Sequence, residues 1–70
     1  MIRKPVSSSN IRSIGYESES QTLEIEFHSG SVYQYFNVPV SIYNALMSAS
    51  SHGSYFHHHI KDRYQWKEVT

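Results

Sequence analysis

The clearest structural signal in this chain is the stretch TLEIEFHSGSVYQYF, residues 22–36. Over residues 22–28, apolar side chains alternate with Glu24, Glu26 and His28, which is typical of a strand with one face buried and the other in water. Ser29-Gly30 then breaks the alternation and favours a turn. The second half is rich in Val, Tyr and Phe, which suit strands. The stretch therefore predicts a β-hairpin.

The register of this hairpin has two alternatives, and it determines where Tyr33 and Tyr35 lie. A two-residue loop at Ser29-Gly30 would put both tyrosines on the outer face, beside the two glutamates. A three-residue loop with Gly30 in the left-handed region would pair Ile25 with Tyr33 and turn both tyrosines toward the core. The three-residue loop is favoured, because Ser-Gly is a poor fit to a type I′ turn.

Two further elements flank the hairpin closely. Residues 9–17 predict a strand with Gly15 at a bulge, followed by a polar loop. After Val38-Pro39, apolar side chains fall at helical spacing over residues 40–49, with Ser41 as a candidate N-cap. This segment is therefore the expected main helix.

The two ends of the chain are read from weaker patterns. Residues 54–60 predict a short second helix capped by Ser54, and residues 64–69 predict a closing strand. Residues 1–5 read as a loose N-terminus, which leaves an expected core of about residues 6–69.

The element order β-β-β-α-α-β indicates the α+β class and a single domain over residues 1–70. Consecutive strands with short connections form an antiparallel meander, and the last strand must return to the sheet after the helices. A strongly bent antiparallel sheet, or a small open barrel covered by one main helix, satisfies these requirements.

Composition excludes several classes of protein. The six Lys+Arg balance the six Asp+Glu, and there is no cysteine, so neither a disulfide framework nor a Cys-type zinc site is expected. No apolar run approaches the roughly 20 residues of a membrane helix. The basic start MIRKP is not followed by an apolar stretch, which argues against a signal peptide. We therefore expect a cytoplasmic protein without membrane contact.

The five histidines invite a metal interpretation, which their spacing does not favour. The consecutive His57, His58 and His59 would point about 100° apart on a helix. His52 and His59 would share a face only if one helix continued through Gly53. We expect no metal site and no other cofactor, but the spacing does not decide whether the run 57–59 has any metal or pH role.

Catalysis is not expected either, and we assign no catalytic residue. The glycines at positions 15, 30 and 53 stand alone, so no glycine-rich phosphate loop is present. A domain of this size would also have difficulty enclosing the usual pocket of roughly 300 Å³ or more.

An uneven charge distribution points to a binding function. Acidic residues gather early in the chain, and the segment 57–67 combines cations with rings: Lys61, Arg63, Lys67, Tyr64 and Trp66. Cations can contact phosphates and exposed rings can stack on bases, so RNA is a candidate partner. Tyr33 and Tyr35 would add a second stacking surface if they were exposed. The competing interpretation makes Tyr64 and Trp66 core residues of the last strand, with the cations on its wet face.

A second candidate function uses the same aromatic residues. Exposed rings also anchor protein interfaces, and opposite charge at the two ends of a neutral domain suits head-to-tail association. The alternative partners are therefore another protein or further copies of this chain.

The order and spacing of several short motifs resemble the KTSC domain family over about residues 6–66. The motifs are SSNIRSIGY at residues 8–16, LEIEF at 23–27, Ser29-Gly30, VYQY at 32–35, Val38-Pro39, Tyr43 with Leu46, GSYF at 53–56 with Ile60, and Arg63-Tyr64. The family's Tyr-x-Tyr motif falls on Tyr33 and Tyr35. His57 and His58 depart from the family, which often has Asn and a basic residue there.

The resemblance implies a single-domain bacterial or phage protein with a fold similar to an Sm-like open barrel. It brings no catalytic residues and no cofactor. The family is named for its place at the C-terminus of some lysyl-tRNA synthetases, and this context suggests RNA binding. An Sm-like fold would also suit self-assembly, since Sm-type domains generally form rings.

Overall fold

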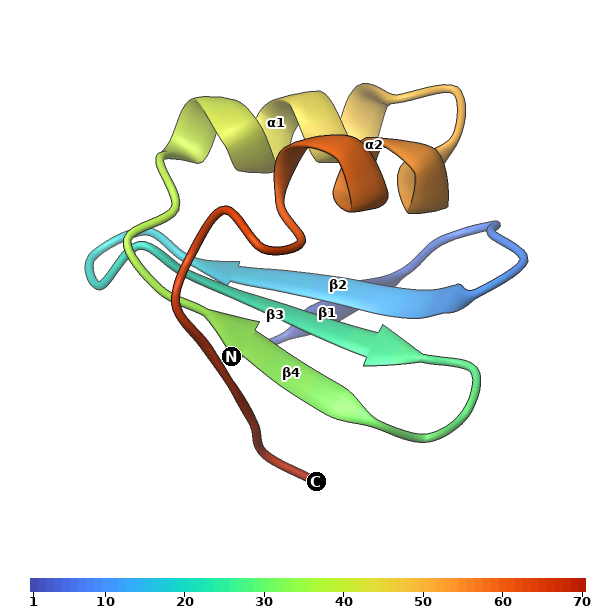
Figure 1. Cartoon of the computed structure of the whole chain (residues 1–70), viewed down its shortest axis with the longest axis horizontal. Helices are drawn as coiled ribbons and strands as arrows, with labels where there is room; N and C mark the ends of the chain where they lie inside the picture. The colour runs from blue at the N-terminus through green and yellow to red at the C-terminus, as the bar shows by residue number, and fades with distance from the viewer.

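The computed structural model describes all seventy residues, which form two layers, a five-stranded sheet and a pair of helices (Figure 1). The elements in chain order are β1 (Arg3–Pro5), β2 (Ile11–Glu17), β3 (Thr22–Phe27), β4 (Val32–Tyr35), α1 (Val40–Ser48), α2 (His52–His59) and β5 (Trp66–Glu68). The expected α+β class is confirmed. Neither helix is long and apolar enough to cross a membrane.

The sheet is antiparallel, and its spatial order β1-β2-β3-β4-β5 follows the chain. The predicted order lacked β1, because residues 1–5 have no alternating pattern and were expected to be loose. In the structure Arg3 lies opposite Gly15 and forms an ion pair with Glu24 on the outer face of the sheet. β1 and β5 are open edges, and the likeness to an Sm-like barrel stays a prediction.

The β3–β4 hairpin adopts the three-residue register. Ile25 lies opposite Tyr33, Leu23 lies opposite Tyr35, and Gly30 has a φ of 98°. A positive φ is easy for glycine because it has no Cβ to clash with the backbone. Tyr33 and Tyr35 therefore point to the same face as the apolar residues of β3.

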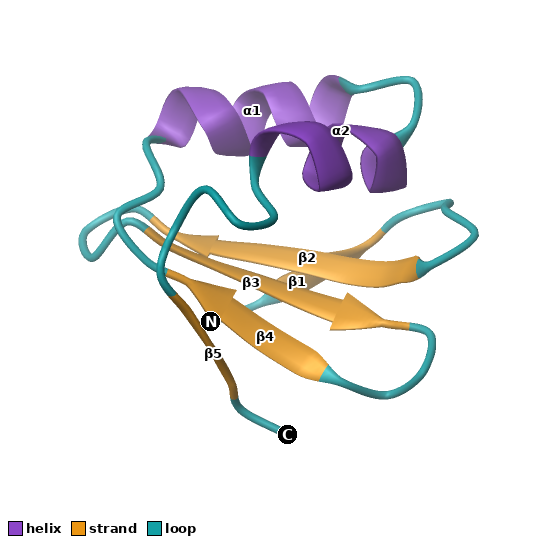
Figure 2. Ribbon diagram, viewed as in Figure 1, coloured by secondary structure: helices purple, strands orange, loops and turns teal.

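Both helices pack on that face of the sheet (Figure 2). Leu46 from α1 and Phe56 from α2 meet the apolar side chains of the strands, and Val38 and Ile60 complete the contact from the flanking loops. The buried core consists of Ile11, Ile14, Leu23, Ile25, Tyr35, Val38, Leu46, Phe56 and Ile60. Burial of this set is the main stabilising term of the fold.

α1 begins at Val40 as predicted, whereas its N-cap and the start of α2 differ from the predictions. The residue before α1 is Pro39 and not Ser41, and it makes no side-chain cap. α2 begins two residues before the predicted start, because the Ser51 hydroxyl accepts a hydrogen bond of 3.2 Å from the Ser54 backbone N–H. Gly53 consequently lies inside a continuous helix instead of ending one.

Candidate functional site

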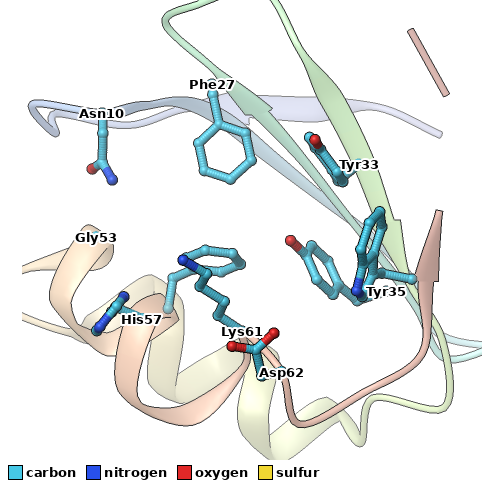
Figure 3. A pocket seen from close by; sticks show the side chains of 10 residues that line it. Asn10, Phe27, Tyr33, Tyr35, Gly53, His57, Lys61 and Asp62 are labelled. Atoms are coloured by element: carbon cyan, nitrogen blue, oxygen red, sulfur yellow. The ribbon is translucent and has the colours of Figure 1, made fainter. Parts of the chain in front are cut away.

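A cleft of about 360 Å³ opens between the sheet on one side and α2 with the turn that follows it on the other (Figure 3). Five rings and a few polar side chains line this aromatic cleft, namely Phe27, Tyr33, Tyr35, Phe56 and Trp66, together with Asn10, Gly53, His57, Lys61 and Asp62. This volume exceeds the roughly 300 Å³ that so small a domain was expected to have difficulty enclosing, but the space is an open cleft and not an enclosed pocket. The cleft lies where the helices stop short of the β4–β5 edge.

The rings of the aromatic cleft form a connected wall. Tyr33 lies 5.3 Å from Trp66 between ring centres, and Phe27 lies 5.9 Å from Tyr33. Phe56 joins the two sides, at 5.5 Å from Phe27 and 5.5 Å from Tyr35. Most of these contacts are tilted or edge-to-face, the favourable geometry for aromatic pairs. The wall is therefore fixed by mutual packing and leaves ring faces and edges toward the cleft.

Strand alternation explains why the rings gather here. Tyr33 and Tyr35 are two residues apart on β4, and Trp66 lies opposite Tyr35 in the β4–β5 register, so all three share one face. Trp66 is on the edge strand beyond the cover of the helices and remains 53% exposed. The interpretation of Trp66 as a core residue is therefore wrong.

The hydroxyl of Tyr35 faces into the cleft (Figure 3). The residue is only 5% exposed, yet this hydroxyl has no hydrogen-bond partner in the protein. No side-chain polar atom is sealed from solvent without a partner, so the hydroxyl opens onto the cleft. Burial raises the pKa of Tyr35 to about 12, and the nearby Tyr33 and Asp62 add to the effect. The hydroxyl therefore keeps its proton at neutral pH.

Lys61 and Asp62 reach the cleft because the chain turns there after α2. The Lys61 backbone N–H donates to the Phe56 carbonyl at 2.9 Å, and Asp62 adopts a left-handed φ of 63°. Neither side chain takes part in an ion pair. The cleft thus offers a free ammonium, a free carboxylate and the Tyr35 hydroxyl to a ligand.

The predicted site residues are only partly brought together. Tyr33, Tyr35, Lys61 and Trp66 line the cleft. The others lie outside it: Arg63 is exposed in the turn, Tyr64 is half-buried against the core, and Lys67 lies opposite Gln34 on the outer face of the sheet.

Sequence reasoning missed several lining residues. Phe27 and Phe56 read as ordinary core positions, and nothing in the chain's local pattern indicates that their ring edges face a cleft. His57 was considered only as a possible metal ligand and as a departure from the family, and Asp62 was not singled out. The strongest available signal was the family segment GSYF, which contains Phe56 next to His57.

The glutamates of β3 lie on the opposite face of the sheet from the cleft. Glu24 pairs with Arg3 and accepts a hydrogen bond of 2.8 Å from the Gln34 side chain. Glu26 accepts one of 2.8 Å from the Ser13 hydroxyl. These carboxylates are engaged in a network of their own and do not repel an anion in the cleft.

The histidines do not converge. His57 lines the cleft, and the ring of His59 packs on Tyr55 at 4.4 Å. His52 lies on the same continuous helix as His59, contrary to expectation, but its Nδ1 is hydrogen-bonded to the Leu46 carbonyl at 2.8 Å. No three His, Asp or Glu side chains gather closely enough to hold a metal ion.

The KTSC domain family matches residues 7–64, which include most of the cleft. This chain belongs to the KTSC domain family. The crystal structure of a KTSC domain protein from Yersinia pestis superposes with a TM-score of 0.96 at 40% identity, covering 99% of this chain and 97% of that one. The likeness extends over the whole KTSC fold described above.

Relatives of this KTSC domain have two very different lengths. An uncharacterized protein of Stutzerimonas stutzeri is 42% identical over 64 residues, covering 91% of this chain and 90% of that protein. A lysine–tRNA ligase of Trichormus variabilis is 45% identical over 60 residues, covering 86% of this chain. The chain spans only 11% of the length of that ligase, so the match concerns one small part of it.

Proposed function

We propose that this KTSC domain is a non-enzymatic binding module for single-stranded RNA and that the aromatic cleft receives its bases. The observation that carries the proposal is Trp66, whose ring is 53% exposed at the edge of a cleft built from four further rings. Every base has a flat face, and stacking on an exposed ring contributes about 1–3 kcal/mol per base. An exposed indole beside a ring-lined cleft suits such a ligand.

The cations near the cleft support an anionic partner. Lys61 lines the cleft and Arg63 is exposed two residues later, and neither takes part in an ion pair. We assign phosphate contacts to these two residues. Lys67 lies on the outer face, so it is the weakest of the three candidates that the sequence suggests.

The polar groups of the cleft favour binding over catalysis. The hydroxyl of Tyr35 has no partner, and Lys61 and Asp62 form no ion pair with one another. Nucleophilic and acid–base catalysis depend on one side chain activating another through such a contact. Isolated donors and acceptors are better suited to recognising a ligand.

The relatives lend a second line of support. Curated proteins that match this chain include lysine–tRNA ligases, whose name contains an RNA substrate. A shared small domain in such proteins is compatible with RNA contact by the domain itself.

A titration of the isotopically labelled chain with short single-stranded RNA, at low and at physiological salt, tests the proposal. We expect amide shifts on β4, β5 and residues 57–67 that weaken with salt, since phosphate contacts release counterions. Lys61→Ala and Arg63→Ala should each flatten the salt dependence by about one unit of slope. Lys67→Ala is the matched control and should leave the slope unchanged, because its side chain lies on the other face.

The absence of any shift at low salt would overturn RNA binding by this chain. Equal slopes for the wild type and the Lys61→Ala and Arg63→Ala variants would overturn the assignment of the phosphate contacts. Shifts confined to the outer face would move the site away from the cleft.

Protein interaction or self-assembly is the second candidate, and the open sheet edges favour it. β1 and β5 have no partner on their outer side, and Trp66 and Val69 are exposed apolar residues near the β5 edge. Unpaired edge strands can add a strand from another chain. Light scattering tests the assembly version, which a mass of one chain across a wide concentration range would exclude.

A further inference from the structure

The Tyr35 side chain combines a buried ring with a hydroxyl that is open to the cleft. Tyrosine hydroxyls in buried positions usually find a hydrogen-bond partner. The less buried Tyr16 follows this rule, since its hydroxyl donates to the Val38 carbonyl. The side chain of Tyr35 is only 5% exposed, but its hydroxyl has no protein partner and points into the cleft (Figure 3). Because no polar side-chain atom is sealed from solvent without a partner, this hydroxyl is open to the cleft, where it can bond to solvent or to a ligand.

The surroundings of this hydroxyl define the chemistry of the ligand. Rings of Phe56, Tyr33 and Trp66 line the same cleft, which favours a flat ligand. Lys61 and Asp62 line the same cleft without an ion pair, so the cleft offers a further donor and an acceptor. The edge of a nucleobase carries both kinds of group next to each other.

The dimensions of the cleft suit a small flat ligand such as one base. The cleft measures about 360 Å³, within the usual range of small-ligand sites of about 300–1,000 Å³. Proteins that read single-stranded RNA commonly splay out one base, stack it on a ring and hydrogen-bond its edge.

We propose that Tyr35 is the specificity-determining residue of the cleft, its hydroxyl hydrogen-bonding the edge of one unstacked base that lies against Trp66. This inference rests on the proposed RNA binding and adds base selection at a single nucleotide. Lys61 and Asp62 flank the same base edge, and the exposed cations supply affinity without selection.

The state of the hydroxyl agrees with this role. Burial raises the pKa of Tyr35 to about 12, so the group remains a neutral donor and acceptor at neutral pH. A binding site with a hydrogen-bonding group discriminates against ligands that cannot bond to it, because they displace solvent and leave that group unpaired. Discrimination between bases therefore depends on a hydroxyl whose position is fixed by the buried ring of Tyr35.

The test uses single-stranded hexanucleotides that differ at one central position, which carries G, A, C, U or no base. We expect the wild-type chain to bind its preferred base about tenfold more tightly than the least favoured base. In Tyr35→Phe, which removes only the hydroxyl, this ratio should fall below about twofold. The abasic hexanucleotide should bind both proteins equally.

Two control variants separate recognition from packing. Tyr33→Phe removes the neighbouring, half-buried hydroxyl and should keep the base preference. Trp66→Ala should weaken binding of all four bases alike by about tenfold, because it removes the stacking surface and not the edge contact. The thermal midpoint of Tyr35→Phe should equal or exceed that of the wild type, since no hydrogen bond within the protein is lost.

The outcomes are distinguishable. Binding of all hexanucleotides with no preference in the wild type would overturn the role of Tyr35 and leave RNA binding intact, as would a preference that survives Tyr35→Phe. A lower thermal midpoint of Tyr35→Phe with an unchanged preference would make the hydroxyl structural. Failure of every hexanucleotide to bind would overturn both proposals.

Discussion

Single residues of one type have different roles in this molecule, and the tyrosines show why. Tyr16 stacks on Tyr43 at 4.8 Å and donates its hydroxyl to Val38, so it connects β2 to the segment that precedes α1. Tyr35 is more deeply buried, but its hydroxyl is left for a ligand. The environment of the hydroxyl, and not the residue type, separates a structural tyrosine from a recognition tyrosine.

The raised pKa of Tyr35 predicts a loss of stability at alkaline pH. The folded-state pKa of about 12 lies above the ordinary tyrosine value of 10.0, so folding favours the protonated form. This stabilisation is fully present below pH 10 and disappears as pH rises through about 12. Urea unfolding at a series of pH values measures it, with Tyr35→Phe as the control.

The variant should lose less stability than the wild type over that alkaline range, because it has no ionisable group at this position. Tyr16, whose pKa is also raised by burial, titrates in both proteins and cancels in the comparison. Parallel curves for the two proteins would contradict the assignment to Tyr35.

At the scale of elements, α2 depends on its N-terminal cap. The Ser51 hydroxyl satisfies the Ser54 N–H, one of the amide groups that a helix start leaves without an internal partner. Ser51→Ala should lower the free energy of unfolding by about 1 kcal/mol. Denaturant unfolding measures this, and Ser50→Ala is the matched control, since the Ser50 side chain is exposed and caps nothing.

A cost for Ser50→Ala as large as that for Ser51→Ala would contradict the capping role. Although α2 carries Phe56 and His57 into the cleft, the loss of the cap should not change the cleft. Fraying of its first turn in Ser51→Ala should leave these residues in place, since they lie in the second half of the helix.

The elements also show how far local pattern reaches. The alternation of β3 and β4 and the glycine at position 30 were sufficient to predict their pairing, which places Tyr33 opposite Ile25. The whole of β1 was missed, because its three residues are held mainly by pairing with β2 and by the Arg3–Glu24 contact across 21 positions of chain. The pattern of neighbouring residues does not predict a contact between residues so far apart in the chain.

At the scale of the whole molecule, the core is small, so substitutions of core residues should unfold the domain whereas substitutions of cleft residues should not. A single core in a domain of this size rarely supplies more than about 3–5 kcal/mol. Leu46 is fully buried between α1 and the sheet, and truncating such a residue costs about 2–5 kcal/mol. Leu46→Ala should therefore leave much of the chain unfolded at 37 °C, as measured by far-ultraviolet circular dichroism.

Trp66→Ala is the comparison at the same scale. Its ring is half exposed on an edge strand of three residues, so its removal should leave the circular dichroism spectrum and most of the stability in place. A collapse of the fold in Trp66→Ala would show that this ring belongs to the core and would remove it from the cleft's recognition surface.

The sequence by itself determined the features that depend on neighbouring residues. Period-two alternation assigned the faces of β3 and β4, Gly30 specified the turn, and helical spacing located α1 within one residue of its observed end. The family motifs indicated membership of the KTSC domain family, whose match covers residues 7–64. Each of these is a property of residues a few positions apart, where backbone geometry and solvent contact act directly.

The tertiary structure alone decided which faces meet. Rings from β3, β4, α2 and β5 come together in one cleft, the cations of the last segment divide between two faces of the sheet, and one buried tyrosine keeps an unpaired hydroxyl. Periodicity indicates which side chains lie on the apolar face of a strand or helix. It does not indicate whether such a side chain packs in the core or lines an open cleft. That distinction depends on where the helices end above the sheet, which results from the packing of the whole chain.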